Sequence, residues 1–212
     1  MDIITTKHLI ADLYLLTILA VIVSSASGVL KAGLLQFDLF GVIIIGIATG
    51  LGGGSLRDLL LDRPVFWIND QSFFVASILS AIIIFIAARL VKITSQHFLI
   101  LDAAGLATFG IAGTLVSLIL NAPPLVASFM GVITGIMGGV FRDVLCNETP
   151  VVFASSLYAT VSWGGSLFFI ALLYLKIDVT LSAIFAGLLI FIARLLAIHF
   201  KICLPKFKFK QS

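Results

Sequence analysis

The sequence has very little charge. Of its 212 residues only 11% are Asp, Glu, Lys or Arg, while 61% are hydrophobic and the mean hydropathy is +1.24. A soluble domain carries about 25% charged residues, and a surface this poor in charge would not keep a protein dispersed in water. The composition therefore excludes an ordinary water-soluble domain and indicates an integral membrane protein.

Cysteine and histidine are scarce as well. The chain has two cysteines, Cys146 and Cys203, and three histidines scattered near the ends of apolar runs. Two cysteines in different segments make neither a disulfide framework nor the ligand spacing of a zinc site. No phosphate loop, zinc-protease helix or nucleophile elbow occurs in its proper context. We therefore expect no enzyme, no cofactor and no metal ion held by the protein, other than a cation in transit.

A broad basic patch is also lacking, although the net charge is +3. The one dense group of cations stands at the C-terminus and consists of Lys201, Lys206, Lys208 and Lys210. Such a group is typical of a cytoplasmic segment near anionic lipid headgroups. We predict that residues 201–212 form a basic cytoplasmic tail, that membrane lipids are partners, and that nucleic acid is not.

Long polar segments are absent, and the chain is instead divided into apolar runs. A helix needs about 20 apolar residues to cross the hydrocarbon core of a bilayer. Seven runs approach or exceed that length: Leu13–Leu30, Leu39–Leu61, Phe73–Val91, Phe98–Leu120, Leu125–Cys146, Val152–Leu175 and Val179–Phe200. The breaks between them are too short for an extramembrane domain. We predict an all-α membrane protein whose residues 1–212 form a single transmembrane domain with seven transmembrane helices.

The distribution of Lys and Arg predicts the orientation, because cytoplasmic loops carry an excess of both. With the N-terminus outside, four cations fall outside, and nine fall inside: Lys31, Arg89, Lys92, Arg142, Arg194, Lys201, Lys206, Lys208 and Lys210. We therefore predict an outside N-terminus and a cytoplasmic C-terminus, and we expect the chain in a bacterial inner membrane.

An internal repeat divides the chain. The stretch "TGLGGGSLRDLLLDRPVFW" (49–67) matches "TGIMGGVFRDVLCNETPVVF" (134–153) at an offset of 85 residues. Each copy lies in the middle span of three, which defines one unit at 12–92, a second at 98–175 and a seventh helix at 179–200. Because three is odd, the second unit enters the membrane from the opposite side. We predict an inverted repeat, an architecture common in transport proteins.

The repeated glycines predict interrupted helices in the second and fifth spans. Gly52, Gly53 and Gly54 in one copy and Gly138 and Gly139 in the other readily leave helical geometry. A helix broken in lipid exposes carbonyl oxygens, and a cation in a watery pathway can satisfy them. The alternative is that the glycines only allow close helix packing. The candidate ion pathway comprises these glycines and their polar neighbours: Thr49, Arg57, Asp58, Asp102, Thr134, Arg142 and Asp143.

The charged pairs of the repeat need a compensating environment, because charge inside a membrane is costly. Arg57–Asp58 and Arg142–Asp143 are expected near opposite mouths of one pathway. The alternative is that both arginines snorkel to the membrane surface from near the helix ends. Asp102 either lines the pathway or is a favourable anion at the N-terminus of its helix.

The two glycine-plus-Arg–Asp motifs, the seven spans and the repeat resemble the bacterial branch of the trimeric intracellular cation (TRIC) channel family. The resemblance covers about residues 12–200, and "GGGSLRDLLLDRPVFW" and "GGVFRDVL" are its specific part. It implies a homotrimer with one pore inside each protomer, bounded by the first, second, fourth and fifth spans. It also implies permeation by monovalent cations, chiefly potassium.

Two functions follow from these patterns. The first is a potassium-permeable monovalent cation channel lined by the glycine-broken second and fifth helices. The alternative is a secondary carrier for a small zwitterion such as glycine, whose carboxylate would bind a helix N-terminus at a break. A coupled carrier usually needs a carboxylate deep in a span. Apart from the motif pairs, Asp102 is the only clear candidate, which favours the channel.

Overall fold

The structure, a computed structural model, describes residues 3–90, 94–154 and 157–205. Three of the predicted tail lysines, Lys206, Lys208 and Lys210, lie outside the described residues. Within those ranges the chain forms helices and no strands, which confirms the all-α class. The helices are α1 (Ile3–Leu34), α2 (Leu39–Leu60), α3 (Phe66–Asn69), α4 (Gln71–Leu90), α5 (Ser95–Ile119), α6 (Pro124–Leu145), α7 (Val151–Ala154), α8 (Ala159–Tyr174) and α9 (Val179–His199).

Six of these helices are long and apolar enough to cross a membrane: α1 from Leu9 onward, α2, α4, α5, α6 and α9. The predicted sixth span, Val152–Leu175, is not one continuous helix. It contains the four-residue α7 and the 16-residue apolar helix α8. At 1.5 Å per residue α8 is about 24 Å long, a little short of the hydrocarbon core.

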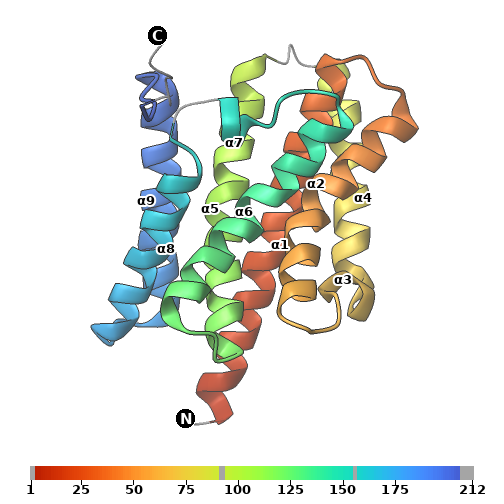
Figure 1. Ribbon diagram of the computed structural model, residues 1–212. Coiled ribbons are helices and arrows are strands. Elements are labelled where there is room, and N and C mark those ends of the chain that lie inside the picture. The colour runs from red at the N-terminus through yellow and green to blue at the C-terminus, as the bar shows by residue number, and fades with distance from the viewer. Residues whose placement is uncertain (1–2, 91–93, 155–156, 206–212) are drawn as a thin grey trace.

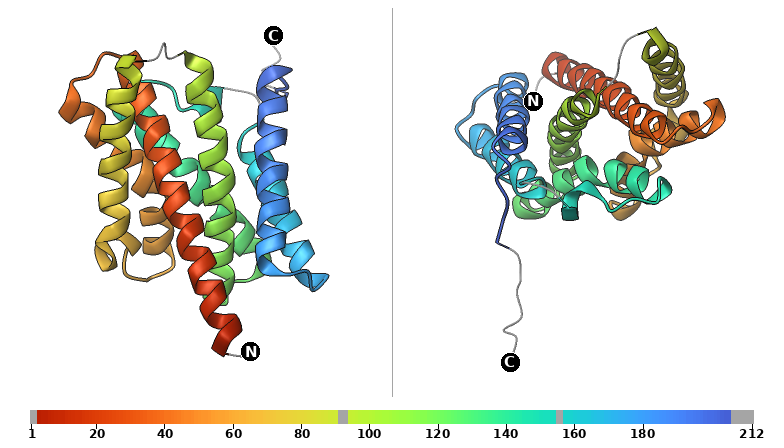
Figure 2. Two further views of the ribbon diagram at one scale, coloured as in Figure 1. Left: turned by 180° about the vertical axis from the view of Figure 1, so that it is seen from behind. Right: turned by 90° about the horizontal axis from the view of Figure 1, so that it is seen from above.

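Four helices form the centre of the molecule. α1, α2, α6 and α5 make a ring in which each helix packs against the next, and α5 closes it against α1. α4 packs on α1 and α2 at one flank. At the other flank α8 packs on α5 and α6, and α9 packs on α5 and α8 (Figures 1 and 2). The two ends of the chain lie at opposite ends of the bundle (Figure 1).

The direction of the chain differs between the two halves. α1, α2 and α4 run up, down and up in Figure 1, whereas α5, α6 and α8 run down, up and down. The middle helices of the halves, α2 and α6, therefore cross the bundle in opposite senses. They bring the two glycine motifs into mutual contact where α2 packs against α6.

Helix ends are made without glycine. Among the described residues, six helices are followed by a residue with positive φ, and all six of these residues are larger than glycine: Gln36, Asp62, Asn121, Asn147, Lys176 and Lys201. All 18 glycines lie in the described residues, and none has positive φ. Helix starts use other devices, such as the Asp38 side chain, which accepts a hydrogen bond from the Gly41 N–H at 2.7 Å. Glycine is thus kept for helix interiors.

Small residues fill the interfaces between the helices. In the part of the chain that the structure describes, seven serines are completely buried: Ser25, Ser77, Ser117, Ser128, Ser162, Ser166 and Ser182. Ser80 on α4 donates its hydroxyl to the carbonyl oxygen of Ile22 on α1 at 2.8 Å. Small and hydroxyl-bearing residues let membrane helices approach closely, where burial of large apolar surface gives little driving force. The result is a tightly packed ring.

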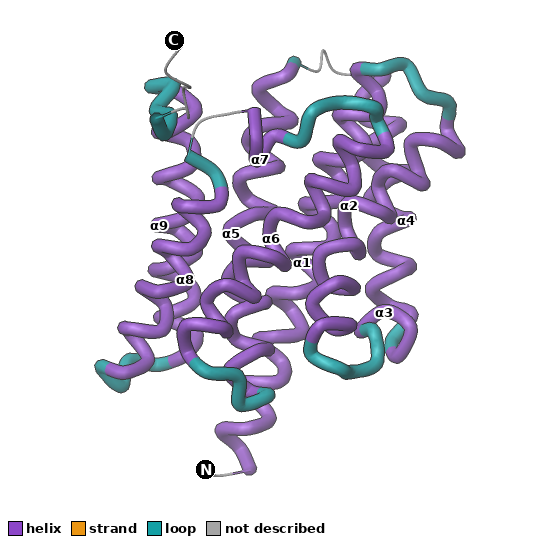
Figure 3. Tube along the Cα trace, in the orientation of Figure 1, coloured by secondary structure: helices purple, strands orange, loops and turns teal. Residues whose placement is uncertain are grey.

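The predicted interruptions of the second and fifth helices are wrong. α2 runs unbroken through Gly52–Gly54, and α6 runs unbroken through Gly138 and Gly139 (Figure 3). The physical reason is that a backbone inside a membrane has few partners other than its own helix, so leaving helical geometry costs more than glycine flexibility gains. Most of these glycines instead allow a group of another helix to pack directly against the backbone of α2 or α6.

Candidate functional site

The glycine motifs meet at the crossing of α2 and α6. A Cβ atom added to Gly53 would overlap the carbonyl oxygen of Thr134, and one added to Gly138 would overlap the carbonyl oxygen of Thr49. These two contacts are equivalent at the 85-residue offset, so each helix offers a glycine to the other's threonine. Only glycine allows two helix backbones to approach this closely. We call these four residues the glycine crossing.

The two threonines also join α2 and α6 to the remaining helices of the ring. The Thr49 side chain lies where a Cβ of Gly28 on α1 would be, and the Thr134 side chain does the same to Gly113 on α5. Each hydroxyl donates to its own helix at 2.6 Å, to the carbonyl oxygens of Ile45 and Met130. Both side chains are buried in helix interfaces.

The other predicted glycines have separate partners. Gly52 lies beneath the ring of Phe141 on α6, and Gly54 beneath the ring of Phe66 on α3, so a Cβ at either position would meet an aromatic ring. Gly139 differs, since a Cβ there would make only ordinary contacts with Arg142 and Tyr158. Close packing therefore accounts for the positions of four glycines and leaves Gly139 without a packing requirement.

The first charged pair lies at the end of α2 on the N-terminal side of the bundle. The Arg57 guanidinium contacts Asp58 Oδ1 through Nη2 and Nε, both at 2.8 Å, and Arg63 Nε stands 3.5 Å from the same oxygen. Asp58 Oδ2 accepts the backbone N–H of Phe66 at 2.9 Å, which holds α3 against α2. Arg57 Nη1 has no hydrogen-bond partner among the described residues.

The second pair lies at the end of α6, at the opposite end of the bundle. Arg142 Nε donates to Asp143 Oδ1 at 2.8 Å, and Arg142 Nη1 donates to Asp102 Oδ1 at 2.7 Å. Asp143 Oδ2 accepts the backbone N–H of Val151 at 2.9 Å, just as Asp58 does with Phe66. The ring of Phe98 stacks 4.6 Å from the Arg142 guanidinium carbon. Asp102 thus joins α5 to the α6 motif.

Two sequence interpretations of these charges are wrong. Snorkelling is excluded because Arg57 and Arg142 are only 2% and 1% exposed and bind carboxylates inside the bundle. The interpretation of Asp102 as an anion at a helix N-terminus also fails. Asp102 is the eighth residue of α5, and the helix dipole acts within about the first turn. Its carboxylate instead pairs with Arg142, 40 positions along the chain.

Comparison with known proteins identifies the family. A family model described as "Glycine transporter" matches the chain twice, at residues 14–89 and 99–174. The UPF0126 inner membrane protein YadS of Escherichia coli (strain K12) is 35% identical over 202 residues, which are 94% of this chain and 98% of that protein. A UPF0126 membrane protein of Vibrio cholerae is 40% identical over 200 residues, 92% of this chain and 82% of that protein.

Solved structures agree with this assignment. The structure of the TRIC trimeric intracellular cation channel orthologue from Rhodobacter sphaeroides matches with a TM-score of 0.85 and 31% identity, over 89% of this chain and 97% of that chain. A second TRIC cation channel matches with a TM-score of 0.82 and 28% identity, over 93% and 98% of the two chains. The chain belongs to the TRIC family. It is a bacterial integral membrane protein, and the solved TRIC structures that it matches are of channels, not enzymes.

Two buried side chains of this TRIC protein were not predicted as part of the site. Arg194 on α9 is fully buried and donates through Nη1 to the carbonyl oxygen of Leu157 at 2.9 Å. Its guanidinium carbon lies 4.5 Å from the centre of the Tyr158 ring, and Tyr158 borders the small void beside Arg142 and Asp143. A lone arginine within an apolar run is itself a signal of a buried polar site, and it could have identified Arg194.

Proposed function

We propose that this TRIC protein is a potassium-permeable monovalent cation channel that forms homotrimers, with one pathway inside each protomer. The observation that carries the proposal is the match of nearly the whole chain to TRIC cation channels, at TM-scores of 0.82 and 0.85. The same four helices that the family resemblance assigns to the pathway make the central ring of this fold.

The proposed pathway runs through the ring of α1, α2, α5 and α6 and is closed at the glycine crossing. Contacts across this crossing are between a glycine and a backbone carbonyl on each side. The nearest side chain across the interface is the Phe141 ring against Gly52, and a small separation of α2 from α6 would open a gap bordered by the carbonyl oxygens of Thr49 and Thr134. Carbonyl oxygens can replace part of the hydration shell of a cation.

The two charged clusters lie toward opposite ends of this proposed pathway, and they differ in formal charge. Arg57, Asp58 and Arg63 sum to +1, because two guanidinium groups share one carboxylate. Arg142 instead stands between Asp102 and Asp143, and those three groups sum to −1. An excess carboxylate concentrates cations near it. We assign Asp102 the role of attracting cations at the end on the C-terminal side.

The proposed architecture is an inverted repeat of two three-helix units with α9 as the additional helix. Three observations support it: the family model matches two successive segments, the halves run in opposite directions, and the glycine contacts are reciprocal at the 85-residue offset. The charge bias of the sequence adds the orientation, with the N-terminus outside and the C-terminus in the cytoplasm.

The carrier alternative loses its structural basis in this fold. It required a helix N-terminus at a glycine break to bind the carboxylate of a zwitterion. Because α2 and α6 continue through their glycines, no such terminus exists at Gly52–Gly54 or at Gly138–Gly139. Whether this protein carries glycine, as the name of the matching family model suggests, is therefore tested by measuring flux.

Flux measurements on proteoliposomes separate the two functions. Vesicles loaded with potassium should lose it passively down its gradient, at a rate that rises linearly with concentration. They should not accumulate labelled glycine under an imposed proton or sodium gradient. Saturable, gradient-driven glycine uptake without passive potassium loss would contradict the channel. Vesicles prepared without protein, and vesicles with the Gly138→Leu variant, are the controls.

A further inference from the structure

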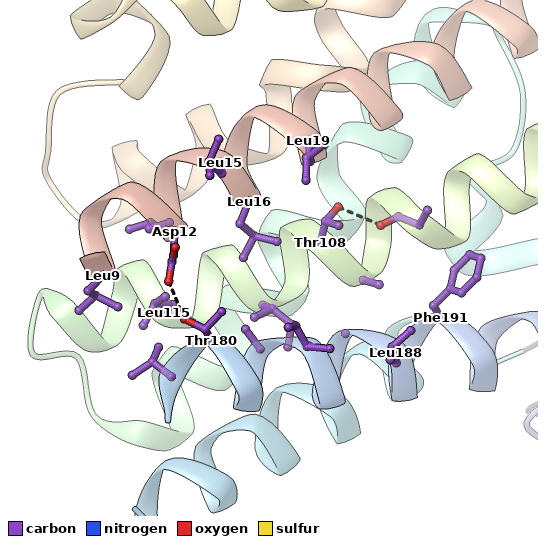
Figure 4. Close-up of a pocket in the computed structure, with 18 residues that line it drawn as sticks. Leu9, Asp12, Leu15, Leu16, Leu19, Thr108, Leu115, Thr180, Leu188 and Phe191 are labelled. Atoms are coloured by element: carbon purple, nitrogen blue, oxygen red, sulfur yellow. Dashed lines mark hydrogen bonds between the residues drawn. The ribbon is translucent and has the colours of Figure 1, made fainter. Parts of the chain in front are cut away.

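A long apolar groove lies outside the ring, between α1 and α9. Its volume is about 510 Å³. The floor is formed by α5, with Ala107, Ile111 and Leu115, and aliphatic side chains of α1 and α9 form the walls (Figure 4). None of the residues assigned to the proposed pathway borders this groove. The proposed ion pathway therefore does not explain the groove.

The groove has the length of one leaflet. It extends along α1 from Leu9 to Leu19 and along α9 from Val179 to Phe191, which is about 15–18 Å at 1.5 Å per residue. Half of a hydrocarbon core is about 15 Å thick. One end of the groove coincides with the first residue of α9 and with the start of the apolar part of α1. The groove therefore reaches from one membrane surface to about the midplane.

Polarity is confined to the surface end. There the side chains of Asp12 and Thr180 form a hydrogen bond between α1 and α9 (Figure 4). The other hydroxyl in the lining, that of Thr108, is turned back to the carbonyl oxygen of Ala104 in its own helix at 2.8 Å. The groove thus has one polar end and an aliphatic remainder about one leaflet long. This shape matches a phospholipid, in which a polar headgroup is joined to an acyl chain.

The absence of a side chain at Gly187 keeps the groove open. Gly187 lines the groove from α9, and a Cβ added there would meet no atom within 4 Å. The glycine is not needed for helix packing at this position, because nothing approaches it. Its neighbours along the groove, Ile184 and Leu188, are half exposed and would be covered by an occupant.

The charge at the surface end selects among headgroups. Asp12 is exposed, and Asp178, the N-cap of α9, adds a second carboxylate at that end. The nearby turn before α9 carries Lys176. With Lys7, five residues before Asp12 on α1, both signs of charge occur at this end. They complement a headgroup that has both an amine and a phosphate, and the exposed Asp12 carboxylate disfavours a headgroup with phosphate alone.

We propose that this groove binds one acyl chain of a phospholipid from the leaflet on the N-terminal side, with an amine-bearing headgroup placed against Asp12. The lipid fills the cleft between α1 and α9 and fastens α9 to the ring. The proposal is independent of whether the ring conducts ions.

Native mass spectrometry of the detergent-purified protein tests the acyl-chain site. Phosphatidylethanolamine is titrated against wild type, Gly187→Leu and the control Gly164→Leu, whose glycine also faces open space but lies on α8 away from the groove. We expect one tightly bound lipid per protomer in wild type and in the control, and at least about tenfold weaker binding in Gly187→Leu. Equal lipid binding by all three proteins would overturn the proposal.

The headgroup is tested by competition between phosphatidylethanolamine and phosphatidylglycerol. Wild type should prefer the ethanolamine lipid. Asp12→Asn should lose that preference, while Asp62→Asn, in an exposed loop elsewhere, should keep it. No preference in wild type would overturn the headgroup assignment. Loss of trimers in Gly187→Leu, without any lipid bound to wild type, would show that the groove is occupied by a second copy of the chain instead.

Discussion

Gly53 and Gly138 matter because of what lies opposite them. Each faces a backbone carbonyl of the other helix, and the residue beside Gly138 in the chain, Gly139, faces no backbone atom of another helix. Two neighbouring glycines in one motif therefore have different physical roles. The charged residues differ in the same way, since the Asp102 carboxylate accepts from the Arg142 side chain, whereas the Asp143 carboxylate accepts both from Arg142 and from a backbone N–H.

The two glycines of α6 can be compared directly. Gly138→Ala should push α2 away from α6, because the new methyl group overlaps the Thr49 carbonyl, and overpacking of this kind costs about 1–3 kcal/mol. Gly139→Ala should be neutral or slightly stabilising, since alanine favours the helix. Thermal stability in detergent, read from the trimer remaining after heating, checks this. Equal melting temperatures for the two variants would refute the backbone contact.

Asp102 can be neutralised without removing a backbone contact. Asp102→Asn should lower cation conductance by at least about twofold, because a unit charge close to a narrow pathway acts strongly on a passing ion. The control is Glu148→Gln, which removes an exposed carboxylate paired with Lys31 at the same end of the bundle. Unitary currents of both variants at normal trimer yield are compared. A conductance in Asp102→Asn equal to that of wild type would remove Asp102 from the pathway.

At the scale of elements, α2 and α6 are each extended by a short helix that a carboxylate holds in place. Asp58 accepts the first N–H of α3, and Asp143 accepts the first N–H of α7. In each case the same carboxylate neutralises the preceding arginine. Because both halves make the same two contacts, Arg and Asp are adjacent in both copies of the motif.

Removal of one such carboxylate should loosen the connection that follows it. Asp143→Ala deletes the acceptor of the Val151 N–H and leaves Arg142 with Asp102 alone, and breaking a buried ion pair costs about 3–5 kcal/mol. Hydrogen exchange of residues 146–154 should become faster. Glu148→Ala, in the same connection, removes only an exposed ion pair worth about 1 kcal/mol or less. Equal exchange in the two variants would contradict the role of Asp143.

The positions of most helices could be predicted from the sequence. Apolar runs set the positions of six spans, because hydropathy alone decides what can remain in lipid. The glycines were misjudged as breaks, because a flexible residue stays helical where no other hydrogen-bond partner is available. The pairing of Asp102 with Arg142 depends on how α5 packs against α6, and spacing along the chain does not report that packing. The same holds for Arg194 and Tyr158.

At the scale of the whole molecule, two halves of opposite direction enclose a four-helix ring, with α9 outside it. The described chain begins and ends at opposite ends of the bundle (Figure 1). The reciprocal contacts of the glycine crossing lie where α2 packs against α6, one of the four helix interfaces of the ring. In the proposed pathway an ion that passes between the two charged clusters crosses at this interface.

Orientation is a prediction for the intact cell. A cysteine introduced at Lys208 should be protected from a membrane-impermeant thiol reagent until the cells are opened, because the lysine-rich segment is expected in the cytoplasm. A cysteine introduced at Asp62, on the N-terminal side, should react in intact cells. The native cysteines are first replaced by serine. Labelling of position 208 from outside would reverse the topology.

Single-channel recording from the purified protein in planar bilayers tests the central claim most directly. Under a potassium chloride gradient the account predicts discrete unitary steps whose reversal potential lies near the potassium equilibrium potential, and which disappear or shrink in Gly138→Leu at normal trimer yield. Recordings without steps, or steps that reverse near the chloride equilibrium potential, would contradict a cation channel that opens at the glycine crossing.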